Sequence, residues 1–228
     1  MKDKRTKFDY LEGFKLLATN PKKFFQKLHQ SINILVPMII IAIVMGVLAY
    51  ISIDKQAYVN ETLKFYENLD RTAPSLAQID QAYIARVASF VYGPLLELLV
   101  KAALVAGLAT MAGGVGSVKT AYSIALYSYM PMLIGKILVV IATGDIEASL
   151  SLAGMMTGFE GDFIYYFLAQ IDPFVILYQI LMIIGIVEIF DVDKKRGTFA
   201  VLCPWILWIG IKAGFQNMNY HYGTDILI

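Results

Sequence analysis

Five apolar runs, each near the length that crosses a lipid bilayer, constrain this chain more than any other feature. They cover residues 32–53, 89–112, 121–141, 173–190 and 198–215. A helix needs roughly 20 mostly apolar residues to cross about 30 Å of hydrocarbon, because every backbone N–H and C=O must be satisfied within the segment. We therefore predict an all-α, polytopic membrane protein with five transmembrane helices.

The composition supports lipid as the solvent for most of the chain. Of the 228 residues, 58% are hydrophobic and 16% are charged, whereas about a quarter of the residues in a soluble domain are charged. The net charge of +1 gives no reason to expect a nucleic-acid partner. Cys203 is the only cysteine, and His29 and His221 are the only histidines. We therefore expect no internal disulfide, no metal centre and no cofactor.

Lysine and arginine gather in three of the segments outside the runs. They occur before the first run at Lys2, Lys4, Arg5, Lys7, Lys15, Lys22, Lys23 and Lys27, after the second at Lys119, and after the fourth at Lys194, Lys195 and Arg196. Residues 144–172 contain no lysine or arginine but five acidic residues. Because cytoplasmic loops are enriched in Lys and Arg, we predict that the N-terminus is inside and the C-terminus outside.

This pattern predicts one membrane domain with two terminal segments. Residues 1–30 form a cytoplasmic basic amphipathic segment, 31–218 form a single five-helix membrane domain, and 219–228 form an outer tail. Within the membrane domain, residues 54–86 are an outer segment whose periodicity predicts a helical hairpin, and 144–172 are an outer acidic loop with an interfacial helix near Phe163.

The segment before the first run carries its own helix signals. Asn20 and Pro21 are typical of an N-cap and a first-turn proline. The helix that follows has an apolar face at Phe24, Phe25 and Leu28, next to Lys22, Lys23 and Lys27. We predict a basic amphipathic helix that lies on the inner face of the membrane.

Residues 113–120 read GGVGSVKT, which partly matches a phosphate-binding P-loop. Val118 occupies the position where that motif requires a glycine, and the run follows an apolar helix rather than a buried strand. We interpret it as a tight cytoplasmic turn, in which Gly113 and Gly114 end one span and Ser117 caps the next.

Charges inside the apolar runs need partners, because an ionised side chain near the bilayer centre costs about 2.5–3.5 kcal/mol. Glu97 and Lys101 are four residues apart, the spacing of an intrahelical ion pair. Lys136 has a similar depth in the third run, so Glu97 could be shared by Lys101 and Lys136. Gln179 and Lys212 lie in the same half of the membrane, which leaves lysine in excess over Glu97. We predict a polar layer in the outer leaflet formed by Glu97, Lys101, Lys136 and Gln179.

That layer has two interpretations. In the functional one it is a site for an ion, a proton or a lipid headgroup. In the structural one the ion pair fixes the helix register, and Lys212 extends its ammonium to the interface. No metalloprotease, serine-hydrolase or other catalytic motif accompanies these charges, so we do not expect an enzyme.

Several features together resemble the Yip-one domain family, the Ypt/Rab-interacting membrane proteins. They are Asn20-Pro21 with Phe24 and Phe25, the stretch AGGVGSVKTAYSIALYSYMPMLIGKIL, and a late span ending near Asp191 before a basic turn. The resemblance covers roughly residues 18–215 and implies five spans with a cytoplasmic N-terminus. Eukaryotic members act in vesicle traffic and bind lipidated Rab GTPases through a longer cytoplasmic region. The basic segment here has about thirty residues, similar to short bacterial members, which implies a bacterial plasma membrane.

Two functional hypotheses follow. The first is a non-enzymatic membrane protein that organises membranes or recruits partners, such as anionic lipid, another protein or a second copy of itself. Its inner-face contact residues would be Lys22, Lys23, Lys27, Lys194, Lys195 and Arg196. The second is a small transporter or channel, for an ion or a lipid headgroup, built on the outer polar layer.

Overall fold

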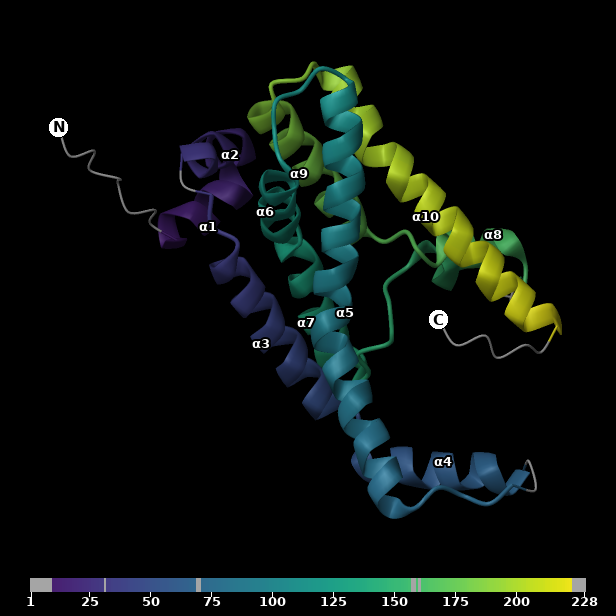
Figure 1. Cartoon of the computed structure of the whole chain (residues 1–228). Coiled ribbons are helices and arrows are strands. Elements are labelled where there is room, and N and C mark those ends of the chain that lie inside the picture. The colour runs from purple at the N-terminus through teal and green to yellow at the C-terminus, as the bar shows by residue number, and fades with distance from the viewer. Residues whose placement is uncertain (1–9, 31, 69–70, 157–158, 160, 223–228) are drawn as a thin grey trace.

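The computed structural model describes residues 10–30, 32–68, 71–156, 159 and 161–222 (Figure 1). The elements in these ranges are ten α-helices and one short 3-10 helix, without a strand among them. The predicted all-α class is therefore confirmed.

Five helical segments are long and apolar enough to cross a membrane, as predicted. They are α3 (Leu35–Ser52), α5 (Leu76–Met111), α6 (Val118–Ser128) with α7 (Met130–Thr143), α9 (Pro173–Phe190) and α10 (Lys194–Tyr222). The third segment is interrupted at Tyr129, and Pro131 lies in the first turn of α7. The break occurs here because proline has no N–H to continue the hydrogen-bond ladder.

The second span extends well beyond the membrane. With 36 residues, α5 is about 54 Å long, whereas the hydrocarbon core is about 30 Å thick. Ser75 and Gln78 form a capping box that starts this helix in the outer segment. Part of the predicted outer segment is thus continuous with the second span.

The outer segment is a helical hairpin, as the periodicity predicted. Figure 1 shows α4 (Lys55–Asn68) crossing the far end of α5. Lys55 pairs with Asp80 at 3.0 Å, and the rings of Tyr58 and Tyr83 lie 5.9 Å apart. These contacts fix α4 to the part of α5 that projects past the bilayer.

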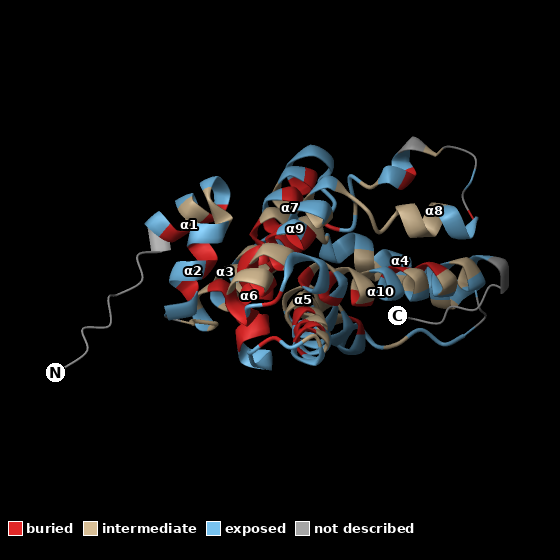
Figure 2. Ribbon diagram, turned by 90° about the horizontal axis from the view of Figure 1, so that it is seen from above, coloured by how far each residue is buried: buried red, intermediate tan, exposed pale blue. Residues whose placement is uncertain are grey.

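The helix α6 forms the centre of the bundle. All its residues from Thr120 to Ser128 are buried, among α3, α5 and α9 (Figure 2). Ala121, Ser123 and Ala125 are small enough for neighbouring helices to approach closely. Tyr127 fills the remaining space and packs edge-on against Phe24 at 5.2 Å.

The N-terminal helices α1 (Tyr10–Thr19) and α2 (Pro21–Gln30) belong to the same core. Asn20 caps α2 as predicted, because its Oδ1 accepts a hydrogen bond from Lys23 N at 3.1 Å. The apolar face of α2, formed by Phe24, Phe25 and Leu28, is fully buried against α9 and α6. The structure thus covers this face with protein, and the position of α2 at the inner membrane face stays a prediction.

The glycine-rich turn between α5 and α6 packs against the end of α9. Gly114 N donates to Ala109 O, Val115 N donates to Phe190 O, and Ser117 caps α6. A Cβ on Gly114 would lie 2.6 Å from Val192 and 3.0 Å from Phe190 O. The predicted tight turn thus has glycine at Gly114 for packing reasons. The N–H groups of Gly113, Gly114 and Val115 all bind carbonyl groups of the protein.

The loop between α7 and α9 contains the 3-10 helix η1 (Leu152–Met155) and α8 (Phe163–Leu168). The predicted interfacial helix near Phe163 corresponds to α8, which packs against α10. Asp172 caps α9 by accepting hydrogen bonds from Phe174 N and Val175 N at 2.7 and 2.8 Å. This loop therefore joins the C-terminal ends of α7 and α10 to the N-terminal end of α9.

Candidate functional site

The predicted intrahelical pair on α5 is present. Lys101 Nζ lies 2.7 Å from Glu97 Oε1, one turn away on the same face of the helix. Glu97 is 35% exposed and Lys101 22% exposed on the surface of the isolated protein. The pair therefore faces away from the core, toward α10.

Two residues of α10 complete the cluster. Trp208 Nε1 donates to Glu97 Oε1 at 3.1 Å, and Lys212 Nζ lies 3.8 Å from the same oxygen. The Lys212 ammonium also lies 5.4 Å from the centre of the Trp208 ring, a cation–π distance. We call these four residues, Glu97, Lys101, Trp208 and Lys212, the charged cluster.

The register of α5 and α10 explains why these residues meet. Arg196 Nη1 donates to Ala112 O at 2.8 Å, which joins the inner ends of the two helices. Glu97 lies 15 residues before Ala112 and Lys212 lies 16 residues after Arg196. At about 1.5 Å per residue, both lie roughly 22–24 Å from this joint. Equal depth on adjoining helices brings the two charges together.

Lys136 does not belong to this cluster, which corrects the expectation that it shares Glu97. Its ammonium donates to Ile146 O at 2.9 Å and to Ala148 O at 3.2 Å. The chain can fold back over Lys136 because Gly144 ends α7 in the left-handed conformation. The following loop then supplies the carbonyl partners.

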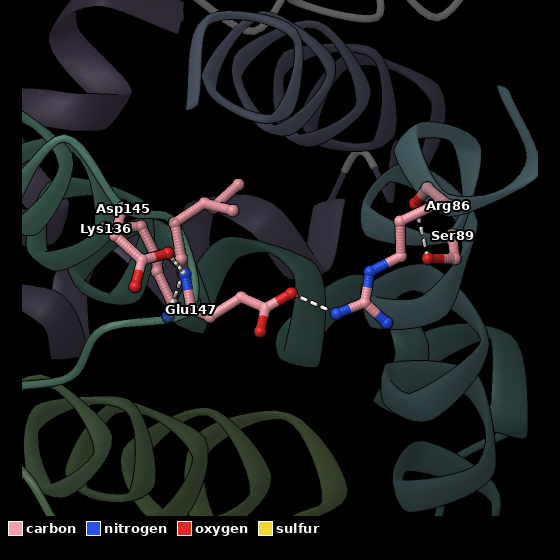
Figure 3. A network of polar contacts seen from close by, with 6 residues as sticks. Arg86, Ser89, Lys136, Asp145 and Glu147 are labelled. Atoms are coloured by element: carbon pink, nitrogen blue, oxygen red, sulfur yellow. Dashed lines mark hydrogen bonds and ion pairs between the residues drawn. The ribbon is translucent and has the colours of Figure 1, made fainter. Parts of the chain in front are cut away.

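The same loop is bound to α5 by an ion pair. Glu147 extends toward Arg86 and pairs with it, and Asp145 Oδ1 accepts from Glu147 N at 2.8 Å (Figure 3). This link was not predicted, since opposite charges near the ends of two different spans do not by themselves indicate contact.

Gln179, the fourth predicted member of the polar layer, is buried on α9 and does not line the space beside Glu97. The predicted set thus divides into Glu97 with Lys101, Lys136 under the loop, and Gln179 in the core. Lys212, expected in the same half of the membrane and, in the structural interpretation, extending to the interface, lies beside Glu97. Trp208 was not predicted. Trp208 and Lys212 are four residues apart, so they share one helix face in the same half of the membrane as Glu97. That spacing was the signal that could have indicated their contact with Glu97.

A groove of about 940 Å³ opens beside the charged cluster, between α5 and α10. Its lining beyond the cluster is apolar over most of its length, with Leu104, Leu108, Cys203 and Leu207 toward the inner joint. Gln216 and Asn219 line the opposite end. We call this space the α5–α10 groove. The two helices separate along it toward the far end of α10 (Figure 1).

The predicted inner-face residues gather at the other end of the bundle. Lys22 and Gln26 bind Glu188 of α9 at 3.0 and 2.8 Å, and Lys27 pairs with Glu12 at 2.7 Å. Glu188 is thus the carboxylate of α9 that binds two side chains of α2. Arg196 pairs with Asp193 in addition to its bond to Ala112.

Within the described part of the chain, no three His, Cys, Asp or Glu side chains lie together as a metal site would require. The expectations that the protein has no metal and no catalytic activity stay predictions.

These features define an α-helical membrane protein of five spans, with a buried third span and a glycine-rich turn packed on the fourth. The sequence model of the Yip1 domain matches residues 14–213. The chain therefore belongs to the Yip1 domain family, as its glycine and proline pattern indicated. No curated protein and no solved structure gave a significant match.

Proposed function

We propose that this protein is a non-enzymatic membrane organiser that recruits partners through the basic end of its bundle, at the cytoplasmic side of a bacterial plasma membrane. The basic end comprises Lys15, Lys22, Lys23, Lys27, Lys119, Lys194, Lys195 and Arg196. One observation carries the proposal: three segments far apart in the sequence hold these residues at one end of the bundle (Figure 1).

Two contacts hold those segments together. The pair between Lys22 and Glu188 joins α2 to α9, and the bond from Val115 N to Phe190 O joins the glycine-rich turn to the end of α9. Glu12, Glu188, Asp191 and Asp193 are the acidic residues among these segments where the structure describes them. The eight basic residues therefore exceed the acidic ones, and the surface attracts anionic partners.

The lysines of this surface have different roles. Lys22 and Lys27 are each paired with a carboxylate, which favours a structural role for them. Lys23, Lys194 and Lys195 are exposed and form no ion pair within the described residues. Lys15 and Lys119 are exposed and form no ion pair there either. In our proposal these five lysines carry the recruiting charge, because their ammonium groups do not have to leave an internal partner, and the test removes Lys23, Lys194 and Lys195.

The test uses the full chain reconstituted in vesicles of neutral phosphatidylcholine. These proteoliposomes are mixed with protein-free vesicles that contain phosphatidylglycerol, and co-flotation measures their association at low and high salt. We expect salt-sensitive association that the triple variant Lys23→Gln, Lys194→Gln, Lys195→Gln weakens at least about tenfold, since each lysine near an anionic surface contributes about 1 kcal/mol.

The matched control removes positive charge at the opposite end. Lys64 on α4 and Arg71 after it are exposed, and Lys64→Gln with Arg71→Gln should leave the association unchanged. Equal association of the wild type and the triple variant would overturn the proposal.

The alternative, transport, is favoured by one observation, the α5–α10 groove beside Glu97 and Lys101. Its test is flux of a small ion or of a fluorescent lipid across liposomes that contain the protein. Glu97→Gln and Lys101→Met should abolish the flux if transport is the function. Wild-type flux no faster than that of empty liposomes would exclude it for the solute used.

A further inference from the structure

The α5–α10 groove combines an excess of positive charge with apolar walls. Glu97 carries one negative charge, whereas Lys101 and Lys212 carry two positive charges against it. Trp208 adds a neutral donor to the same carboxylate oxygen. The cluster thus has one positive charge without a carboxylate partner in the described residues.

Such a charge requires a counter-anion if the cluster lies inside the hydrocarbon. The cluster is roughly 22–24 Å from the joint between Ala112 and Arg196, and the hydrocarbon core is about 30 Å thick. With the joint at the inner boundary of the hydrocarbon, the cluster lies about 6–8 Å below the outer boundary. An uncompensated ammonium at that depth costs free energy that a bound anion would remove.

The walls indicate what the anion is attached to. Val100, Leu104 and Leu207 line the groove and are more than half exposed on the isolated protein, so they face lipid chains in a membrane. Gln216 and Asn219 form the polar end nearer the membrane surface. A headgroup can therefore reach the cluster from that end, while acyl chains follow the leucine walls.

We propose that the α5–α10 groove binds one monoanionic phospholipid, whose phosphodiester is held between Lys101 and Lys212. The groove volume of about 940 Å³ is near the upper end of the ~300–1,000 Å³ range of ligand pockets, enough for the headgroup and the first part of the chains. Glu97 keeps both ammonium groups in place and limits the excess to a single charge. A zwitterionic lipid brings its own cation and does not supply this balance.

A bilayer lipid explains the site better than a second copy or a soluble anion does. A second copy would bring the same excess of lysine to the interface and double the positive charge. A soluble anion has no apolar part that could pack against the walls of the groove. The proposal is independent of the recruitment function, because this groove and the basic end lie at different depths of the bundle.

The experiment measures lipid binding to the purified full chain in detergent by native mass spectrometry. Phosphatidylglycerol and phosphatidylethanolamine of equal chain length are added in equal amounts. We expect one phosphatidylglycerol to remain bound to the wild type at collision energies that remove phosphatidylethanolamine. Lys212→Met should lower the bound fraction at least about fivefold, and Lys64→Gln should leave it unchanged.

Two further readouts separate binding from folding. Glu97→Gln raises the net charge of the cluster, so it should retain phosphatidylglycerol at least as strongly as the wild type, whereas a purely structural cluster would lose it. Cys203 lines the groove, and its alkylation by N-ethylmaleimide should be slowed by phosphatidylglycerol. Equal retention of both lipids, or a Cys203–Cys203 crosslink between copies that excludes lipid, would overturn the proposal.

Discussion

At the scale of single residues, one carboxylate oxygen of Glu97 accepts contacts from Lys101, Lys212 and Trp208. A shared acceptor makes the members of the cluster interdependent. Loss of the carboxylate leaves two ammonium groups to repel each other, whereas loss of Lys212 leaves the pair on α5 intact. Substitutions of Glu97 and Lys212 should therefore lower the free energy of unfolding by different amounts.

We predict that Glu97→Gln lowers the free energy of unfolding by about 1–3 kcal/mol in lipid-free detergent, because unpaired charges in a partly buried site are costly. Lys212→Met should cost less than about 1 kcal/mol. Thermal unfolding followed by intrinsic fluorescence measures both. A larger loss for Lys212→Met than for Glu97→Gln would contradict the central role of Glu97.

Part of this site could be predicted from the sequence. The spacing of Glu97 and Lys101 identified their pair because both lie on one helix, where geometry follows from residue numbers. Lys136 and Lys212 have similar depths in their spans. Hydropathy predicts how deep a residue lies, but it predicts neither the rotation of a helix about its axis nor which helices pack against each other. The choice between them depended on Gly144, which folds the outer loop over Lys136, and on the contact of α5 with α10.

At the scale of elements, glycines set the separation between the α5–α6 turn and the end of α9. A Cβ at Gly114 would meet two backbone oxygens, those of Ala109 and Phe190, at 2.9 and 3.0 Å. Backbone atoms cannot rotate away as a side chain can. Gly114 is therefore required by the close packing of the turn against these two carbonyl groups.

Gly114→Ala should lower the free energy of unfolding by about 1–3 kcal/mol, the usual cost of forcing extra volume into a packed site. Gly107 on α5 is the matched control, because a Cβ there meets nothing within 4 Å. Gly107→Ala should be neutral or stabilising by up to about 1 kcal/mol, as alanine favours the helix. Thermal midpoints in detergent compare the two, and equal midpoints would show that the turn tolerates a side chain.

The apolar face of α2 gives a second prediction at this scale. Phe25 is 0% exposed and contacts Gly185 of α9. Phe25→Ala should lower the free energy of unfolding by about 3–5 kcal/mol and expose α2 to limited proteolysis. Lys23→Ala, on the exposed face of the same helix, is the control. Unchanged protease resistance of Phe25→Ala would indicate that lipid, rather than α9, covers this face.

The helix signals in the sequence are local, and Asn20 and Ser117 cap the helices that they were predicted to cap. A cap depends on a side chain and on backbone groups two or three residues away. The burial of α2 depends on a helix some 150 residues later in the sequence. An amphipathic pattern indicates that one face of a helix is buried. It does not indicate whether protein or lipid buries that face.

At the scale of the whole molecule, the structure places the basic end and the hairpin of α4 and α5 at opposite ends of the bundle (Figure 1). The excess of lysine and arginine at the basic end predicts that this end faces the cytoplasm. The recruitment proposal depends on this orientation, because it needs a cytoplasmic surface. For the groove, the orientation decides only from which leaflet the lipid comes.

Labelling of single cysteines in intact cells tests the orientation. Cys203 is first replaced by serine, since it is the only cysteine. We predict that a membrane-impermeant maleimide labels Glu61→Cys on α4 in intact cells but labels Lys195→Cys only after lysis, as both positions are exposed to solvent at opposite ends. The reverse pattern would mean that the basic end faces outward. Lys23, Lys194 and Lys195 would then lie at the outer surface of the membrane, and the groove would take its lipid from the cytoplasmic leaflet.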